Sequence, residues 1–149
     1  MTQTIWTPRM TVSAVIERDN KFLIVEEIDD GQQVFNQPAG HLEDKESLID
    51  AIEREVLEET GFLFTASAFT GLYRWSPPHL DLTFMRVNFI GHIGAQPVSD
   101  KLDNDIIATH WLSASELEQR PLRSPLVMRC IEDYLQRPHY PLDALIEQS

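Results

Sequence analysis

Apolar and polar residues alternate along much of the chain with the period of two that is typical of β-strands. Two such runs lie within residues 11–27, and the turn-forming pair Asp19-Asn20 between them predicts a hairpin. The other segments of this kind cover residues 34–40, 62–75, 80–93 and 106–112. The first of these is a short strand that enters the bend Pro38-Ala39-Gly40, and a polar loop is expected over residues 92–105.

Helical periodicity replaces this alternation in two segments, residues 47–60 and residues 124–136. Ser47 fits the start of the first helix, and Gly61 fits the left-handed position just after its end. Ser113 with Glu116 is expected to cap a shorter helix. The residues expected to face inward from the last helix are Leu126, Val127, Cys130, Ile131 and Leu135. This order of strands and helices predicts one α/β domain, residues 1–149, with a mixed β-sheet between helices.

The composition narrows the range of partners. The chain has 149 residues with a formal net charge of -12, and such an acidic surface repels DNA and RNA. A small phosphorylated ligand remains compatible with this charge if a metal ion bridges it to the protein. A single cysteine excludes an internal disulfide, and no apolar run approaches the roughly 20 residues that cross a membrane. We therefore expect a cytoplasmic protein, either a monomer or a homodimer.

The end of the first helix carries an unfavourable charge pattern. The stretch REVLEETGF places Glu55, Glu58 and Glu59 in the last turns, where the helix dipole disfavours each carboxylate by roughly 0.3–1 kcal/mol. At about 100° per residue the three side chains share an arc of about 100° and can converge on one point. Such a cluster is typical of a site for a hard cation such as Mg²⁺, although a solvated acidic face has the same local pattern.

The residues before this stretch favour a cation site over a solvated acidic face. Gly40 is followed after five residues by Glu46, and after seven more by Arg54-Glu55-Val56-Leu57-Glu58-Glu59-Thr60-Gly61-Phe62. This spacing resembles the Nudix box, G-x5-E-x7-R-E-U-x-E-E-x-G-U with U apolar, at each defined position. The resemblance implies a Nudix-type α/β/α sandwich that hydrolyses phosphoanhydride bonds with Mg²⁺ as cofactor, Mn²⁺ being the alternative ion.

The resemblance also implies roles for individual residues. Glu55, Glu58 and Glu59 match the positions of the metal ligands and the base, and Arg54 matches the arginine that orients them. The carbonyl of Gly40 matches one that reaches the metal. An additional acid often comes from a loop beyond the box, and Asp103 and Asp105 are the candidates, with Asp105 slightly preferred.

The substrate is less well determined by the sequence. Three further segments, FNQPAGHLE, LRSPLV and YPL, resemble a phosphatase branch of the family. That branch implies release of single phosphates from nucleoside di- and triphosphates and from hydroxymethylpyrimidine pyrophosphate, a thiamine precursor. Two alternatives stay open, an ADP-ribose or nucleotide pyrophosphatase of the MutT type and a non-catalytic ligand-binding Nudix domain; the intact box argues against the second.

A phosphorylated substrate also requires cationic and planar contacts from the protein. The sequence offers three arginines for the phosphates and one tryptophan that could stack on a planar ring, although aromatic residues in strands more often simply pack. These candidate substrate-binding residues are Arg74, Trp75, Arg86 and Arg123.

Overall fold

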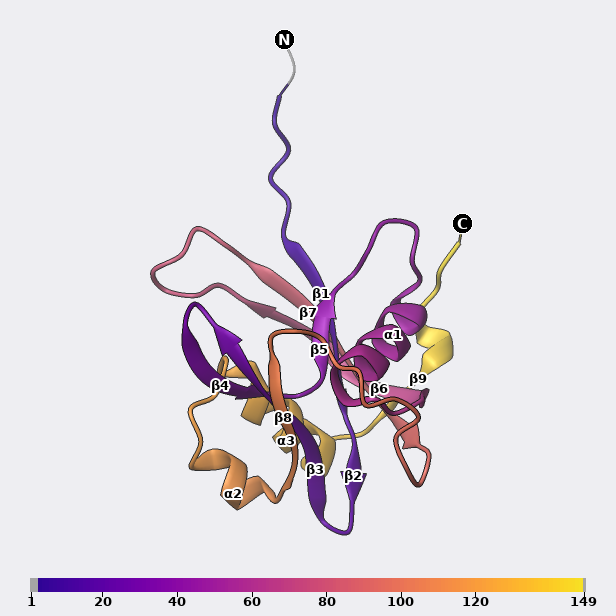
Figure 1. Ribbon diagram of the computed structural model, residues 1–149. Coiled ribbons are helices and arrows are strands. Elements are labelled where there is room, and N and C mark those ends of the chain that lie inside the picture. Colours follow the sequence, from indigo (N-terminus) through magenta and orange to yellow (C-terminus); the bar gives the residue numbers. More distant parts are fainter. Residues whose placement is uncertain (1–2, 149) are drawn as a thin grey trace.

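The computed structural model describes residues 3–148, which form two β-sheets flanked by helices (Figure 1). The strands of the larger sheet lie in the order β5 (Ala39–His41), β1 (Arg9–Val15), β7 (Phe84–Ile93), β6 (Phe64–Trp75) and β9 (Tyr140–Pro141). Strands β1 and β7 run parallel, whereas the other neighbours run antiparallel. The predicted mixed sheet is therefore confirmed, although β6 and β7 begin a few residues later than expected.

A second, antiparallel sheet was not anticipated from the sequence. Its strands are β2 (Glu17–Arg18), β3 (Lys21–Asp29), β4 (Gln32–Asn36) and β8 (Ile106–Leu112). The first apolar run continues through Ile16 without interruption, which hides the break at this residue, where the chain leaves β1 and enters the new sheet. The predicted hairpin turn is present, because Asp19 and Asn20 both adopt positive φ between β2 and β3.

Helices cover both faces of the larger sheet. On one face, α1 (Leu48–Thr60) buries Ile52 and Val56 against Val12 and Phe89. On the other face, α3 (Leu126–Gln136) packs against the alternate strand residues, and the short α2 (Ala114–Glu118) adds Leu117 to the same cluster. The final segment is a 3-10 helix, Leu142–Ala144. The larger sheet thus has one hydrophobic core on each face, because successive side chains of a strand point to opposite faces.

One residue of α3 was assigned to the wrong face. Leu135 was expected to point inward, yet it is 53% exposed. The buried stripe of Val127 and Ile131 continues through Tyr134, whose ring packs edge-on against Phe22 at 5.9 Å. Leu135 lies about 100° around the helix from Tyr134, which turns it toward solvent.

Helix α1 begins and ends at the residues that the sequence predicted, Ser47 and Gly61. The Ser47 hydroxyl accepts a hydrogen bond from the Asp50 N–H at 3.0 Å, and Gly61 ends the helix with φ of 79°. The Gly61 carbonyl also accepts from the Val98 N–H at 2.8 Å, so the loop before β8 lies against the helix end. No helix in the described part of the chain, residues 3–148, is long and apolar enough to span a bilayer.

Replacing Gly61 with alanine tests how closely this loop is held. Gly61 and Gly31 both have positive φ, but an added Cβ meets nothing at Gly31, whereas at Gly61 it collides with the Ser99 carbonyl oxygen. We expect Gly31→Ala to lower the free energy of unfolding by about 1–2 kcal/mol through backbone strain. Gly61→Ala should lower the free energy of unfolding by about 1–3 kcal/mol more than Gly31→Ala, because the added Cβ also overpacks against the Ser99 carbonyl oxygen. Urea denaturation of both variants measures the difference, and equal losses would contradict the close packing.

Candidate active site

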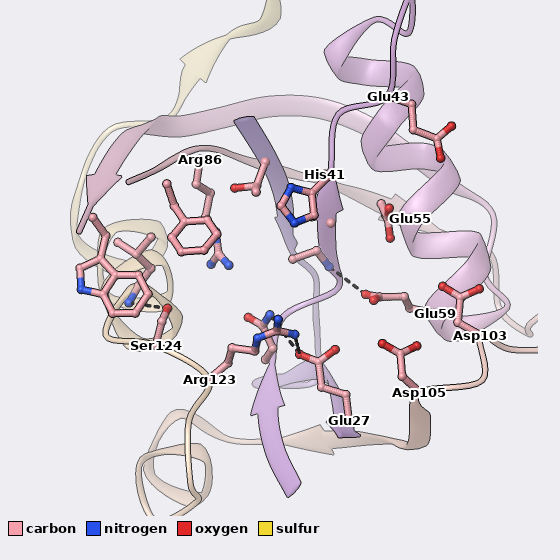
Figure 2. A pocket seen from close by; sticks show the side chains of 17 residues that line it. Glu27, His41, Glu43, Glu55, Glu59, Arg86, Asp103, Asp105, Arg123 and Ser124 are labelled. Atoms are coloured by element: carbon pink, nitrogen blue, oxygen red, sulfur yellow. Dashed lines mark hydrogen bonds and ion pairs between the residues drawn. The ribbon is translucent and has the colours of Figure 1, made fainter. Parts of the chain in front are cut away.

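Three carboxylates meet where the end of α1 faces the loop before β8. Glu55 and Glu58 come from α1 and Asp103 from the loop, and one oxygen of each lies within 4.8 Å of the other two. The Asp103 N–H donates to the Glu58 carbonyl oxygen at 2.9 Å, which attaches the loop to the helix. In Figure 2, Glu55, Glu59 and Asp103 lie on the same side of a pocket. A set of carboxylate oxygens is the donor chemistry that Mg²⁺ and similar hard cations prefer.

Arg54 lies among these acids and orients them. Its Nε donates to Glu46 at 2.6 Å, while its Nη1 donates to Glu55 at 2.7 Å and to Glu58 at 3.1 Å. Its Nη2 also donates to the His41 carbonyl oxygen at 3.1 Å. The hydrogen bond from Arg54 holds the pKa of Glu46 below its ordinary value. Because the guanidinium is rigid and planar, these contacts hold Glu55 and Glu58 in defined orientations.

The two buried glutamates of α1 resist ionisation. Burial raises the pKa of Glu55 to about 7, although Arg54 opposes the shift. Burial raises the pKa of Glu59 to about 9, against the opposing hydrogen bond that the Ala39 N–H donates to its Oε1 at 2.9 Å. Neighbouring carboxylates add to both shifts. A divalent cation in this position would favour the ionised forms of both side chains.

Gly40 allows the strand β5 to approach α1 closely. A Cβ added at this position would collide with the Glu55 carboxylate. A side chain at this position would therefore displace the Glu55 carboxylate, whereas the backbone itself does not demand glycine, since its φ is not in the left-handed region. Only a residue without a side chain leaves the Glu55 carboxylate beside the backbone of the Pro38-Ala39-Gly40 bend.

The acids line one end of a pocket of about 340 Å³. Figure 2 shows Glu43, Glu55, Glu59, Asp103 and Asp105 toward one side, with Arg86 and Ser124 toward the other. Three further lining residues neighbour these two: Phe84 lies two residues before Arg86 on β7 and stacks on Trp75, and Leu126 follows Ser124 at the start of α3. The pocket is thus acidic at one end, and aromatic and cationic at the other.

Three of the four predicted substrate-binding residues line this pocket, namely Trp75, Arg86 and Arg123. Arg74 does not line it and is exposed on β6. The reason is the alternation of the strand, which directs Arg74 and Trp75 to opposite faces.

Both candidate loop aspartates line the pocket, in different surroundings. Asp103 belongs to the three-carboxylate cluster, whereas Asp105 lies outside it and is exposed. Burial, with Asp105 nearby, raises the pKa of Asp103. The negative charge of Asp105 also contributes to the raised pKa of Glu59, so the two groups face the same space.

Sequence reasoning missed Glu27, a carboxylate on β3 that is 2% exposed and lines the pocket. Its Oε1 accepts from Arg123 Nη1 at 2.7 Å, and Arg123 Nε lies 3.4 Å from Asp29. The signal was available in the stretch FLIVEE, where an acid occupies a position that strand alternation directs inward. Arg123 is thus neutralised within the protein.

Comparison with known proteins agrees with this site. The NUDIX domain pattern matches residues 7–130. The chain is 38% identical to Phosphatase NudJ of Escherichia coli K12 over 143 residues, which cover 95% of this chain and 92% of that protein. It therefore belongs to the Nudix family and is a Nudix hydrolase, and the acidic cluster agrees with the divalent metal that such hydrolases generally use.

Solved structures support the same assignment. A NUDIX hydrolase from Nitrosomonas europaea superposes with a TM-score of 0.91 at 46% identity, covering 95% of this chain and 98% of that one. A MutT NUDIX hydrolase from Burkholderia pseudomallei superposes with a TM-score of 0.72 at 20% identity, covering 86% and 98%. The second likeness shows the shared fold alone.

The raised pKa values of Glu55 and Glu59 predict how the metal-free protein responds to pH. Both folded-state values, about 7 and about 9, exceed the ordinary value of 4.5. The folded protein therefore holds more protons than the unfolded chain between about pH 4.5 and 9, and its stability falls as pH rises through this window. We expect the double variant Glu55→Gln, Glu59→Gln to lose this part of the pH dependence.

Urea denaturation at several pH values, in the presence of EDTA, measures the effect. The matched control is Glu53→Gln, which removes a carboxylate from α1 that does not line the pocket. Saturating Mg²⁺ should stabilise the wild type more at pH 8 than at pH 5, because protons compete with the cation. The assignment is wrong if the double variant keeps the pH slope of the wild type.

Proposed function

We propose that this Nudix hydrolase releases single phosphates from nucleoside di- and triphosphates and from hydroxymethylpyrimidine pyrophosphate, using Mg²⁺ or Mn²⁺. The observation that carries the proposal is the cluster of Glu55, Glu58 and Asp103 beside a pocket that has Arg86 on its opposite side (Figure 2). The phosphatase assignment draws on the likeness to Phosphatase NudJ, which extends over 95% of the chain.

The donor set fits a divalent cation. Glu55, Glu58 and Glu59 would hold it together with the Gly40 carbonyl, and Asp103 or Asp105 would contribute from the loop. When bound, such an ion neutralises phosphate charge and lowers the pKa of a coordinated water. Arg54 keeps Glu55 and Glu58 in place, so little reorganisation is needed during the reaction.

In the proposed reaction, water attacks one phosphorus of a P–O–P linkage. The bond between that phosphorus and the bridging oxygen breaks, and the bridging oxygen leaves with the other phosphate. One water is consumed, and its proton passes to a protein carboxylate. Glu55, Glu59 or the loop aspartate would accept it, since a bound cation would keep these carboxylates ionised near neutral pH. No covalent enzyme intermediate is required.

Substitution of the box glutamates tests the assignment. We expect Glu59→Gln to keep the fold and to lower kcat roughly 10²–10⁴-fold, the usual effect of losing a group that transfers a proton. Glu58→Gln should also lose most activity, because it removes a proposed ligand. Glu53→Gln on the same helix should retain wild-type activity, since Glu53 does not line the pocket.

The assay measures inorganic phosphate from GTP, GDP, ADP-ribose and hydroxymethylpyrimidine pyrophosphate, with and without added inorganic pyrophosphatase. Phosphate released directly from the di- and triphosphates supports a phosphatase. Phosphate that appears only with the added enzyme means pyrophosphate release and contradicts it. Full activity of both Glu58→Gln and Glu59→Gln would overturn the assignment of the site.

A further inference from the structure

A buried arginine at the non-acidic end of the pocket has no carboxylate partner. Arg86 on β7 is 7% exposed, and it lines the pocket. No ion pair to Arg86 is formed by residues 3–148, and its Nε lacks a hydrogen-bond partner there. Its Nη1 has only a long contact of 3.4 Å with the Gln37 side-chain oxygen.

The groups around Arg86 do not neutralise it. Burial raises the pKa of the Cys130 thiol, although the charge of Arg86 and a hydrogen bond with Arg86 oppose the shift, so this neighbour of the guanidinium carries no charge near neutral pH. Asp133, the acid on the adjacent α3, accepts hydrogen bonds from Arg129 and from the Tyr73 hydroxyl instead. A buried cation without a counterion is costly, and a bound anion would remove that cost.

The same end of the pocket contains the start of α3. Ser124 and Leu126, on either side of the N-cap Pro125, both line the pocket. Pro125 makes no side-chain capping bond, although the Ser124 Oγ accepts from the Leu126 N–H at 3.2 Å, and the first turn of this 11-residue helix has no acidic residue. The partial positive charge of the helix N-terminus is therefore not offset by a carboxylate of that turn, and such helix ends favour phosphate groups.

The other arginine of the pocket is already engaged. Arg123 pairs with Glu27 at 2.7 Å and lies 3.4 Å from Asp29. The contrast identifies Arg86 as the pocket arginine without a carboxylate partner among residues 3–148. The rings of Trp75 and Phe84, stacked with centroids 5.9 Å apart, complete the wall beside it.

We infer that Arg86 and the N-terminus of α3 form a binding subsite for the terminal phosphoryl group of the substrate. This inference rests on the proposed function and names its substrate class. Figure 2 shows Arg86 on the opposite side of the pocket from Glu55, Glu59 and Asp103, and we place the diphosphate of the substrate between them. Because the guanidinium is buried, the group that reaches it is the end of a ligand rather than its middle.

The subsite sets the selectivity of the enzyme. A nucleoside di- or triphosphate ends in a phosphoryl group with a single bridging oxygen, which carries the highest charge in the molecule and fits the unneutralised cation. A diphosphate capped on both sides, such as ADP-ribose, lacks this group. The phosphoryl group held by Arg86 is the one released as inorganic phosphate, while the organic part of the substrate extends away from the subsite.

Binding of inorganic phosphate to the metal-free protein tests the subsite independently of catalysis. Calorimetric titration in EDTA should show binding to the wild type and to Glu59→Gln, which leaves the cationic end intact. Arg86→Gln should weaken the affinity about 10- to 100-fold, the usual effect of losing hydrogen bonds to a charged group. The matched control is Arg74→Gln, which removes the same charge from an exposed site on the neighbouring strand and should bind as the wild type.

Steady-state kinetics provide the second readout. Arg86→Gln should lower kcat/KM for GTP and GDP about 10- to 100-fold, with no loss on any capped diphosphate that the wild type hydrolyses. Arg86→Lys, which keeps the charge without the planar fork, should recover part of the phosphate affinity. A urea midpoint at or above that of the wild type would show that the variants are folded.

The possible outcomes separate the two proposals. The subsite is refuted if Arg86→Gln binds phosphate as tightly as the wild type, or if Arg74→Gln weakens binding equally. If the wild type binds phosphate through Arg86 but hydrolyses none of the substrates, the proposed function fails and the subsite stands. If Arg86→Gln is unfolded, wild-type phosphate affinity in folded Arg86→Lys would overturn the geometric role of the guanidinium.

Discussion

Repulsion among carboxylates at the end of α1 is the constraint around which the site is arranged. Glu55, Glu58 and Asp103 bring three oxygens within 4.8 Å of one another, at the helix end where the dipole already disfavours negative charge. Arg54 supplies one guanidinium for Glu46, Glu55 and Glu58 together, so the compensation is incomplete. Burial raises the pKa values of Glu55 and Glu59, repulsion from neighbouring carboxylates adds to the shifts, and a bound cation would favour the ionised forms.

Several features of the fold follow from holding these acids in place. Gly40 lets the bend before α1 lie against the Glu55 carboxylate, where a larger residue would collide. Gly61 ends α1 and accepts the Val98 N–H, while Glu58 accepts the Asp103 N–H through its carbonyl oxygen. The glycines, Arg54 and the loop therefore serve one purpose, which is to keep a strained acidic cluster in a fixed geometry. The apolar packing of α1 against the sheet offsets the free energy that the clustered carboxylates cost.

The parts of the structure that depend on local spacing could be predicted from the sequence. The positions of Arg54 and its neighbouring glutamates follow from helical periodicity, and Gly61 follows from the end of the helix. What could not be predicted depends on tertiary contacts. Arg74 and Arg86 are equally good candidates for phosphate binding from the sequence. In the structure, the alternation of side chains along β6 and β7 leaves Arg74 exposed and places Arg86 in the pocket. Glu27 joins the site from a strand distant in sequence, and the choice of Asp103 over Asp105 for the three-carboxylate cluster depends on the fold. The split into two sheets depends on a break at a single residue, Ile16.

The central claim is that the acidic end of α1 is organised around a divalent cation. Electron paramagnetic resonance of Mn²⁺ tests it directly, because free and protein-bound Mn²⁺ give different signals without substrate or turnover. The account predicts that wild-type protein depletes the free Mn²⁺ signal near neutral pH, that Mg²⁺ competes for the ion, and that Glu58→Gln binds far more weakly. Equal depletion by Glu58→Gln and the wild type, or none by either, would contradict it.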